Sequence, residues 1–541
     1  MTADFSGKSK QWFRWLANLT VLARFCAHNR KVFRTGGKND GEAPIMLMEL
    51  TSTHSAHVAY AYIAEEMAKS IGAQIKAYSP TPLNSPMRAL KFLSSGKSSV
   101  YRSFGVNEFI RIKPSSAQKQ EARRLFSEVV RNMTSKRDIE DLRIDGVWIG
   151  DLVYDSYLRR YSLPTIDPES QHFQDFLLES IETFVFWNDY FDKHDVRAIN
   201  VSHCTYNLAM PLRIGVERGI DVFNVSITHV YRLDKNRLFS YNDAFEFRER
   251  FAALSEDVRN AGLSLAEKRI LQRFDGEVGV DMSYSTKSAY GDHRHSRLLH
   301  DSNKKKILIA THCFFDSPHV YGKYLFPDFY EWLDFLGNIS HQTDYEWYLK
   351  THPDYRPGTE EIIADFVSRF PKISLLPSDA SHLQIIDEGI DVALTCHGTI
   401  GFEYAALGVP VINASMSNPH VAYNFNIHAR DIEHYRELLG NLDGLELHID
   451  KNEIFEYYFM RNIFNTENLF FEDYRRFLDN IGGYKAQFSP VAYQQWLAEW
   501  SPGKHEKILS GLHEFVTSKD FRMDYRHFGQ EFTLKHLERF S

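Results

Sequence analysis

A lysine, a hydroxyl group and an imidazole follow one another directly after a strand-like run in YEWYLKTHPD, residues 345–354. The ammonium group of Lys350 and an imidazole N–H of His352 would both donate hydrogen bonds to a phosphate. Pro353 would end the strand, because it lacks the backbone N–H that a sheet ladder needs. We therefore predict a phosphate-binding site at this strand end. The alternative is a plain strand end at which His352 caps the backbone.

A second stretch that suits phosphate, TCHGTIGFEYAALGVPVI, covers residues 395–412. After a short strand, His397, Gly398 and Thr399 are expected to form a tight turn that leads into a helix. The free N–H groups of a helix N-terminus bind phosphate, and glycine lets a ligand approach the backbone closely. The carboxylate of Glu403, about one helical turn further on, could accept hydrogen bonds from ribose hydroxyls. The stretch predicts a second wall of the site, although each glycine alone has an ordinary structural explanation.

Two further loops follow strands and could reach the same place. The loop LPSDAS, residues 376–381, offers Ser378 and Asp379 to a nucleotide base, unless these residues only cap the next helix. The loop THCFFDSPH, residues 311–319, offers His312, Asp316 and His319 to a cleft. Each of these residues taken alone also has a structural explanation. The loops form one site only if the fold brings their strand ends together.

Strands and helices alternate around these loops over residues 305–415. Apolar runs such as KILIATH and IDVALTC are each followed by a stretch with apolar residues at helical spacing. The same alternation occurs over residues 44–79 and 196–225. This order is typical of parallel sheets, whose ligands bind beyond the carboxyl ends of the strands. We predict an α/β fold of two Rossmann-like domains with a central cleft.

Changes in composition set the predicted boundaries. They give a basic amphipathic N-terminal segment 1–42, a first Rossmann-like domain 43–285, a polar linker 286–300, a second Rossmann-like domain 301–450 and a helical region 451–541. The helical region either closes the cleft or forms a partner interface. Its many aromatic residues are expected to be core residues.

Composition and charge argue against several classes of protein. Of the 541 residues, 43% are hydrophobic and 25% charged, as in an ordinary folded domain protein. A net charge of -8 argues against nucleic-acid binding, which needs a basic face. The four cysteines lie far apart and no two aspartates are separated by one residue, so we expect no metal site. No run is apolar enough to cross a bilayer and no signal peptide is visible, so we expect a cytoplasmic protein.

The first forty residues combine tryptophans with an excess of basic residues. Eight lysines and arginines stand against two aspartates in residues 1–40. A helix of this kind over residues 10–34 can lie in the inner membrane interface, with aromatic side chains at headgroup depth and cations on anionic lipid. It can equally pack on its own protein with its charges in solvent. Both interpretations stay open.

Residues 305–415 resemble the nucleotide-binding half of GT-B glycosyltransferases, in particular those that build bacterial capsules and surface polysaccharides. KTHP is similar to the His-Pro motif of bacterial sialyltransferases and capsular Kdo transferases, and to a basic-x-His-Pro element of CDP-glycerol glycerophosphotransferases. HGTIGFEYAALGVPVI resembles the G-T/S-x-x-x-E-x-x-x-x-G-x-P-V-I stretch of many GT-B enzymes. The match covers about a fifth of the chain. It is specific for GT-B enzymes but not for one sugar.

The resemblance implies roles for the residues singled out above. The donor phosphate would lie between the KTHP strand end and the turn at Gly398, with the ribose at Glu403 and the base near Ser378. The residues that would hold the donor are His312, Lys350, His352, Pro353, Ser378, Asp379, His397, Gly398, Thr399 and Glu403. Families with the His-Pro element use CMP- or CDP-linked donors, which favours a cytidine nucleotide. No cofactor beyond this co-substrate is implied.

A glycosyltransferase also needs a base for the acceptor hydroxyl, and GT-B enzymes supply it from the N-terminal domain. Strand-end loops of that half offer His54, Asp151 and His203. We favour Asp151, because VWIG reads as a strand that ends directly before it, and we place His54 second. Each of the three has a structural alternative: Asp151 could cap a helix and His203 could bond only to backbone.

The sequence thus predicts an inverting, metal-independent glycosyltransferase that moves a sugar, such as CMP-linked Kdo or a nonulosonic acid, onto a surface glycan. The acceptor would be an oligosaccharide or a lipid-linked glycan. Two other enzymes fit the same fold: a polyol-phosphate transferase and a sugar-nucleotide epimerase. A non-catalytic scaffold and a nucleotide-binding sensor are the alternatives from other classes.

Overall fold

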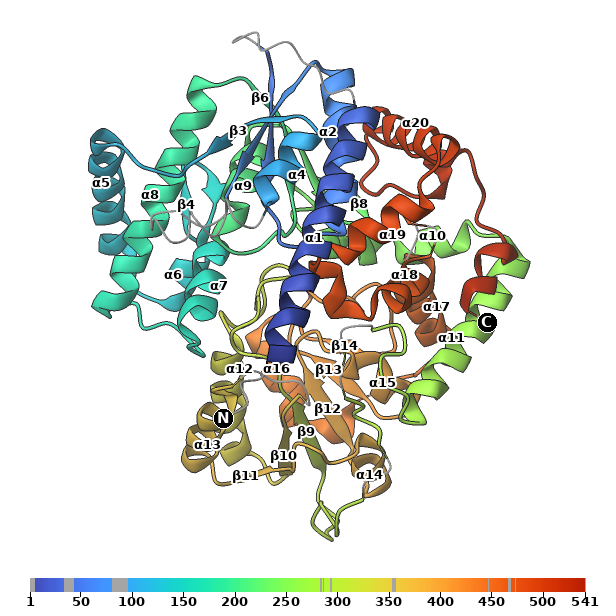
Figure 1. Ribbon diagram of the computed structural model, residues 1–541. Helices are drawn as coiled ribbons and strands as arrows, with labels where there is room; N and C mark the ends of the chain where they lie inside the picture. Colours follow the sequence, from blue (N-terminus) through green and yellow to red (C-terminus); the bar gives the residue numbers. More distant parts are fainter. Residues whose placement is uncertain are drawn as a thin grey trace.

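The computed structural model of the chain describes most of its 541 residues, and for residues 5–17 it describes the backbone only. The described ranges are 5–33, 43–79, 96–282, 285, 287–291, 294–352, 357–445, 447–465, 469–471 and 473–540. Within them the chain folds around two six-stranded sheets, one in each half (Figure 1).

The N-terminal sheet has the strand order β3-β2-β1-β6-β7-β8. Its strands are β1 (Ile45–Glu49), β2 (Gln74–Tyr78), β3 (Val106–Ile110), β6 (Val196–Val201), β7 (Asp221–Val225) and β8 (Val230–Leu233). All neighbours pair in parallel except β7 and β8, which are antiparallel. Every residue of β1 is buried, as expected for a strand covered on both faces. The strand order reverses direction between β1 and β6, which is where ligands of such sheets bind.

Helices cover both faces of this sheet. They are α1 (Phe5–Val32), α2 (Ala56–Ser70), α4 (Lys97–Ser103), α5 (Ser116–Asn132), α6 (Lys136–Glu140), α7 (Gly150–Tyr161), α8 (Gln171–Lys193) and α9 (Met210–Glu217), with a small hairpin of β4 (Arg143–Ile144) and β5 (Val147–Trp148). The middle strands are therefore enclosed, and their carboxyl ends are left as the surface that can carry a site.

The C-terminal sheet has the equivalent order β11-β10-β9-β12-β13-β14, and all its strand pairs are parallel. Its strands are β9 (Lys306–Ala310), β10 (Glu346–Lys350), β11 (Ile373–Leu375), β12 (Val392–Thr395), β13 (Val411–Asn413) and β14 (Ile427–His428). The helices are α12 (Phe329–Gln342), α13 (Thr359–Arg369), α14 (His382–Asp387), α15 (Ile400–Ala406) and α16 (Ile432–Gly440). The predicted pair of Rossmann-like domains is confirmed.

The last ninety residues pack on both halves. Their elements are α17 (Lys451–Phe459), the π-helix η4 (Met460–Phe464), α18 (Tyr474–Ile481), the 3-10 helix η5 (Tyr484–Phe488), α19 (Val491–Glu499) and α20 (Pro502–Ser518). Helix α17 packs on α15 and on α11 (Glu256–Phe274), beside the C-terminal sheet, whereas α19 contacts α1 and α20 contacts α2 (Figure 1). Most of their aromatic residues are buried, so the expectation that they belong to the core is confirmed.

Helix α1 forms at the predicted basic segment, and its second half packs on its own protein. Phe25 and Phe33 are buried in the N-terminal core, and the Phe25 ring stacks on Tyr493 at 4.1 Å. Over the described residues, no helix has both the length and the apolar character that spanning a bilayer requires. The predicted linker 286–300 is not a free connection, because Tyr290 and Leu299 are buried against the C-terminal half.

The carboxyl edges of the two sheets face each other across the domain interface. Tyr206, which follows β6, donates a hydrogen bond to Asp316 Oδ1 at 2.9 Å and accepts one from Ser317 Oγ at 2.6 Å. Asp316 and Ser317 lie in the loop that follows β9. The strand-end loops singled out from the sequence are thereby gathered in one region.

Candidate active site

A pocket lies at the carboxyl edge of the C-terminal sheet. It is lined by the ends of β9, β10 and β12, by the first residues of α14 and α15, and by residues of the segment 277–290. Six of the ten predicted donor-binding residues line it: His312, Lys350, His352, Gly398, Thr399 and Glu403. The fold thus brings together three of the four predicted loops.

Lys350 places a buried ammonium group in this pocket. The side chain is 2% exposed, and its Nζ donates one hydrogen bond, to the carbonyl oxygen of Ser378 at 3.0 Å. Burial lowers the pKa of Lys350 to about 8, and the nearby charge of Asp379 opposes the shift. An ammonium group has three N–H donors, and no carboxylate of the described residues lies within 4.0 Å of it. The pocket therefore retains capacity to bind an anion.

His312 is a neutral imidazole with a defined tautomer. Its Nε2 lies 3.2 Å from the backbone nitrogen of Cys396, and a backbone N–H can only donate, so Nε2 accepts. The proton of the neutral ring is therefore on Nδ1. Burial lowers the pKa of His312 to about 3, and the ring packs against Phe329 and His397, with ring centroids 4.6 and 4.3 Å away. His312 is thus a fixed hydrogen-bond donor that carries no charge.

The turn before α15 requires glycine at position 398. A Cβ there would lie 2.8 Å from Thr395 Oγ1 and 3.3 Å from the ring of His312. The backbone N–H of Gly398 donates to the same Thr395 Oγ1 at 3.1 Å. This close packing holds Gly398 and Thr399 at the wall of the pocket, as the sequence predicted.

Glu403 lines the pocket, but protein groups already engage both of its carboxylate oxygens. One oxygen forms an ion pair with Arg273 of α11, and the other accepts from the hydroxyl of Tyr290 at 2.9 Å. Thr399 Oγ1 lies 3.3 Å from the second oxygen. A ribose bound at Glu403 would therefore share the carboxylate with these groups, and the role predicted for Glu403 stays a prediction.

Three of the other four predicted donor residues, Ser378, Asp379 and His397, lie outside the pocket lining. Ser378 contributes its carbonyl oxygen to Lys350, and Asp379 contacts Nε2 of His295 at 3.1 Å. The ring of His397 lies on the side of the turn that faces Tyr324, whose hydroxyl is 2.8 Å from Nδ1. Pro353 is outside the described residues.

His382 is a pocket residue that sequence reasoning missed. It begins α14, directly after the LPSDAS loop, and its Nδ1 lies 2.8 Å from the hydroxyl of Tyr404. Burial and the charge of Lys350 hold its pKa well below the usual range, so its imidazole is neutral. The signal was present, because the histidine opens a helix after a strand-end loop, but the prediction used the serine and aspartate before it.

The prediction of Asp151 as the acceptor base does not fit the structure. Its carboxylate accepts hydrogen bonds from both Nη groups of Arg213, at 3.2 and 2.5 Å, and both side chains are 1% exposed. A carboxylate held in this way cannot reach an acceptor hydroxyl without breaking a buried ion pair, which costs several kcal/mol. Asp151 lies in the first turn of α7 and holds the inner wall of the N-terminal domain.

His54 and His203, the other two candidates, remain accessible. His54 is partly exposed, and its Nδ1 donates to the carbonyl oxygen of Ser52 at 3.1 Å, because a carbonyl can only accept. Its Nε2 is therefore the unprotonated nitrogen, and burial lowers the pKa of the ring to about 4. His203 is exposed beside Asp316, and the surrounding protein lowers its pKa. Both rings are neutral at pH 7.

Glu49 is a second residue that the sequence did not suggest. It ends β1 at the point where the strand order reverses, and Ser202, directly after β6, donates its N–H and its Oγ to the two carboxylate oxygens, each at 2.7 Å. Burial raises the pKa of Glu49 to about 7 despite these hydrogen bonds. Since the side chain is 2% exposed, we assign it no contact with substrate.

His319 was expected to line the cleft but is buried in the domain interface. Its Nδ1 lies 2.6 Å from Asp155 of α7 and its Nε2 lies 3.2 Å from Glu140 of α6. The two carboxylates raise the pKa of His319 well above the usual range, although burial opposes this. A charged imidazolium with two carboxylates therefore fixes the loop after β9 to the N-terminal domain.

The comparisons with known proteins find structural likenesses alone. No family model and no curated protein sequence matches the chain. Among solved structures it is similar to the Thermosulfurimonas dismutans KpsC beta Kdo 2,4 transferase, with 11% identity, a TM-score of 0.31, and coverage of 49% of this chain and 79% of that chain.

Two further structures cover more of the chain at lower scores. A Rickettsia africae glycosyltransferase has 11% identity and a TM-score of 0.23, over 88% of this chain and 100% of that chain. The UDP-GlcNAc 2-epimerase of Neisseria meningitidis has 12% identity and a TM-score of 0.21, over 79% of this chain and 95% of that chain. Because these scores are low, the chemistry proposed below rests on the side chains of this chain.

Proposed function

We propose that the protein is a glycosyltransferase of GT-B type that binds a nucleotide sugar in the pocket at the carboxyl edge of the C-terminal sheet. Lys350 carries the proposal: it is a buried lysine that lines the pocket and has one protein hydrogen bond. A buried charge with little compensation from the protein is costly, and Lys350 differs from the buried Lys306, which also bonds one carbonyl oxygen, in that it faces a pocket. A phosphate in the pocket would supply the missing partner.

The same residues suit the chemistry of glycosyl transfer. Negative charge develops on the phosphate as the bond to the anomeric carbon breaks, and fixed donors that face it lower the barrier. Lys350 would supply a positive charge there, and the Nδ1–H of His312 and the backbone at Gly398 would supply hydrogen bonds. This set needs no metal ion, and the described residues contain no group of His, Cys, Asp and Glu placed to hold one.

The acceptor base in this proposal is His54. Its Nε2 is unprotonated and its Nδ1–H is held by Ser52, which fixes the ring for proton transfer. It lies in the loop after β1, at the carboxyl edge of the N-terminal sheet. A base on the domain opposite the donor fits single displacement with inversion at the anomeric carbon. His203 is the alternative base.

The donor and the acceptor follow from the resemblance of the His-Pro and HGTIGFE stretches. We propose a cytidine nucleotide that carries an acidic sugar such as Kdo or a nonulosonic acid, and an acceptor that is an oligosaccharide or a lipid-linked surface glycan. The protein would work in the cytoplasm, at the inner face of the membrane, and residues 10–34 would contact the membrane through basic side chains that α1 leaves exposed, such as Arg24 and Arg30. The excess of basic residues in that segment supports this placement.

Calorimetric titration of the full-length protein with CMP and, as the comparison, UMP, each with and without EDTA, tests the proposal. We expect CMP to bind more tightly than UMP, with no effect of EDTA and a loss of affinity in His352→Ala. Tighter binding of UMP would keep the transferase and reject the cytidine donor. If neither nucleotide binds, the proposed function is wrong and the non-catalytic scaffold becomes the better explanation.

A further inference from the structure

Arg461 is a cation at the domain interface that lacks a carboxylate partner. Within the described residues no Asp or Glu oxygen lies within 4.0 Å of its guanidinium group, and its hydrogen bond goes from Nη2 to the hydroxyl of Tyr321 at 2.9 Å. Its guanidinium carbon also lies over the ring of Tyr241 at 6.0 Å. The side chain is half-buried, so solvent still reaches it.

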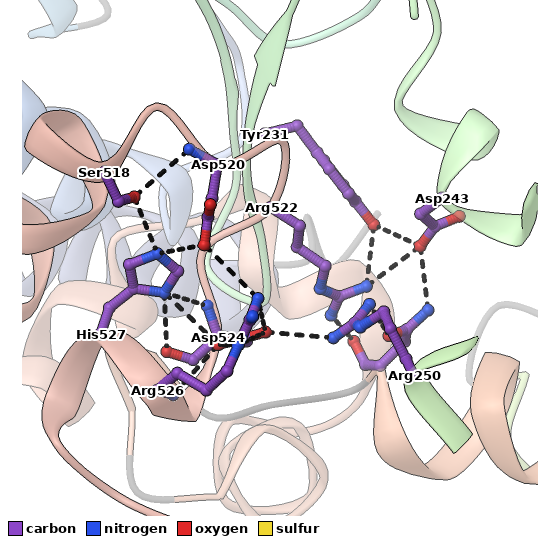
Figure 2. A network of polar contacts seen from close by, with 10 residues as sticks. Tyr231, Asp243, Arg250, Ser518, Asp520, Arg522, Asp524, Arg526 and His527 are labelled. Atoms are coloured by element: carbon purple, nitrogen blue, oxygen red, sulfur yellow. Dashed lines mark hydrogen bonds and ion pairs between the residues drawn. The ribbon is translucent and has the colours of Figure 1, made fainter. Parts of the chain in front are cut away.

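Five other arginines of the same region are paired with carboxylates. In Figure 2, Arg522 forms an ion pair with Asp243 at 3.1 Å, and Arg250 forms one with Asp524 at 3.4 Å. The same holds for Arg248 with Glu453, Arg269 with Asp281 and Arg273 with Glu403. Carboxylates neutralise these five arginines, and Arg461 is the exception among the six.

The backbone at Arg461 is also unusual. Arg461 lies in the π-helix η4, and widened turns of this type occur frequently at functional sites. The end of this π-helix is held in place: Asn465 accepts from Arg250 at 3.2 Å and donates to Asp243 at 2.9 Å. The network in Figure 2 thus fixes the position of the helix turn while leaving the guanidinium group of Arg461 unneutralised.

The position of Arg461 relates directly to the proposed donor pocket. The ring of His312, which lines the pocket, lies 4.3 Å from that of His397, and His397 lies 5.0 Å from the ring of Tyr321. Arg461 is therefore on the far side of His397 from the pocket. Tyr241, whose ring is 5.0 Å from that of Tyr321, belongs to the N-terminal half. A sugar that extends from a phosphate at Lys350 past the ring of His397 would reach this interface.

The neutral groups around Arg461 do not compensate its charge. The pKa values of His397 and His420 both lie well below the usual range. Burial is the larger cause, and neighbouring groups that include Arg461 add to it. His420 is fully buried, and both of its ring nitrogens lack a hydrogen-bond partner. The site therefore combines an unneutralised cation with unused polar groups.

We propose that Arg461 recognises the carboxylate of an acidic sugar, with Tyr321 orienting the guanidinium group. A guanidinium group binds a carboxylate through two parallel hydrogen bonds, which suits a planar group better than a hydroxyl. The carboxylate can belong to the donor sugar or to the acceptor, since both would lie between the two domains. The inference rests on the proposed function only for the source of this carboxylate.

The donor is tested by titrating CMP-N-acetylneuraminate and CMP into the wild type and Arg461→Gln. We expect the variant to bind the acidic donor on the order of 10–100-fold more weakly, as for a lost hydrogen bond to a charged group, and CMP within about twofold. Arg461→Lys keeps the charge but not the two parallel N–H donors, so its affinity for the acidic donor should lie between those of the wild type and Arg461→Gln. Arg248→Gln is the matched control, because it removes an arginine that Glu453 already neutralises.

The acceptor is tested by saturation-transfer NMR, with and without CMP. The probes are the methyl glycosides of N-acetylneuraminate, Kdo and glucuronate, each compared with its methyl ester. The wild type should bind at least one acid in preference to its ester, and Arg461→Gln should lose the preference. An effect confined to the titration assigns the carboxylate to the donor, and one confined to the glycosides assigns it to the acceptor.

Three results would overturn the inference. An equal loss for CMP in Arg461→Gln would show that Arg461 contacts phosphate. An unchanged preference in Arg461→Gln would show that another group reads the carboxylate, and no preference in the wild type would show that none does. If no nucleotide binds but the glycoside preference depends on Arg461, the inference stands and the proposed function falls. Thermal unfolding of each variant identifies a general loss of structure.

Discussion

The carboxyl edges of the two sheets face each other but carry their charges in opposite ways. On the N-terminal edge, the acidic groups all have protein partners. Glu49 accepts hydrogen bonds from Ser202, and Asp151 and Asp155 form ion pairs with Arg213 and His319. On the C-terminal side, Lys350 and Arg461 have no carboxylate within 4.0 Å in the described part of the chain.

This difference separates structural charges from charges that are available to a ligand. A buried ion pair adds little net stability, but removing one partner is costly, so the pair fixes the positions of the two side chains. A buried cation without a partner costs stability and is retained where it binds something. The N-terminal edge therefore looks like the rigid side of the cleft, and the C-terminal edge like the side that takes up an anion.

The largest expected effect is on turnover, through the base. His54→Gln keeps a side chain of similar polarity but removes the unprotonated nitrogen, and a general base contributes about 10²–10⁴-fold to the rate. We expect kcat for nucleotide release with acceptor present to fall by that factor, with nucleotide affinity unchanged. His203→Gln is the comparison. A larger loss in His203→Gln would move the base to that residue.

The buried ion pairs of the N-terminal edge should contribute to the stability of the fold. Asp151→Ala leaves Arg213 buried without a partner, so we expect the free energy of unfolding to fall by about 3–5 kcal/mol in urea titrations. Replacing both residues, Asp151→Leu with Arg213→Met, should recover most of this loss. If Asp151→Asn instead kept full stability and abolished turnover, Asp151 would be a base after all and the contrast between the edges would fail.

On the opposite edge, Lys350→Met should weaken nucleotide binding more than it changes stability. Losing a charged hydrogen bond costs about 1.5–3 kcal/mol, so calorimetry should show a roughly 10–100-fold weaker Kd. Lys306 is the matched control, because it is a buried lysine at the amino end of β9 whose Nζ donates to the carbonyl oxygen of Ser302 at 3.0 Å. Equal losses in Lys306→Met would mean that the effect is structural.

Glu49 gives a smaller effect that depends on pH. Its folded pKa, about 7, lies above that of an unfolded glutamate, so its contribution to stability is full at low pH and is lost as pH rises toward and through 7. Glu49→Gln mimics the neutral form, so the stability of the variant relative to the wild type should rise by about 1–3 kcal/mol between pH 5 and 8. A constant difference in denaturant unfolding across this range would contradict the raised pKa.

The exposed pair between the edges should matter least. Arg159 forms an ion pair with Asp316 across the interface, and both side chains are substantially exposed, at 35% and 49%. Exposed pairs contribute about 0–1 kcal/mol, so Arg159→Gln should change the unfolding free energy by less than about 1 kcal/mol. A larger loss, measured alongside a salt titration, would show that the edges depend on this contact.

The C-terminal half was predictable because its signals are local. Buried parallel strands read as short apolar runs, and the polar residues directly after β9, β10 and β12 did converge on one pocket. The glycine at 398 could be read as a turn residue. Its contact with His312, across 86 positions of sequence, could not, because it depends on how β9 and β12 pair.

The rest depended on contacts between distant residues. Asp151 was chosen because it follows a strand, but its partner Arg213 lies on another helix. The partners of Glu403, Arg273 and Tyr290, come from α11 and from the segment read as a linker. Sequence position identifies which polar residues reach a strand end, but it does not show which of them the fold already pairs.

The path of the chain's end has a mechanical consequence. The chain passes from the N-terminal half to the C-terminal half before α11 and returns after η4. It passes over once more after α20, because Phe532, Leu537 and Phe540 pack with α11 and α17, so three backbone segments connect the halves (Figure 1). A single connection would let the halves rotate in every direction, whereas three separated connections restrict their relative motion. The distance between Lys350 and Arg461 should therefore change little when a ligand binds.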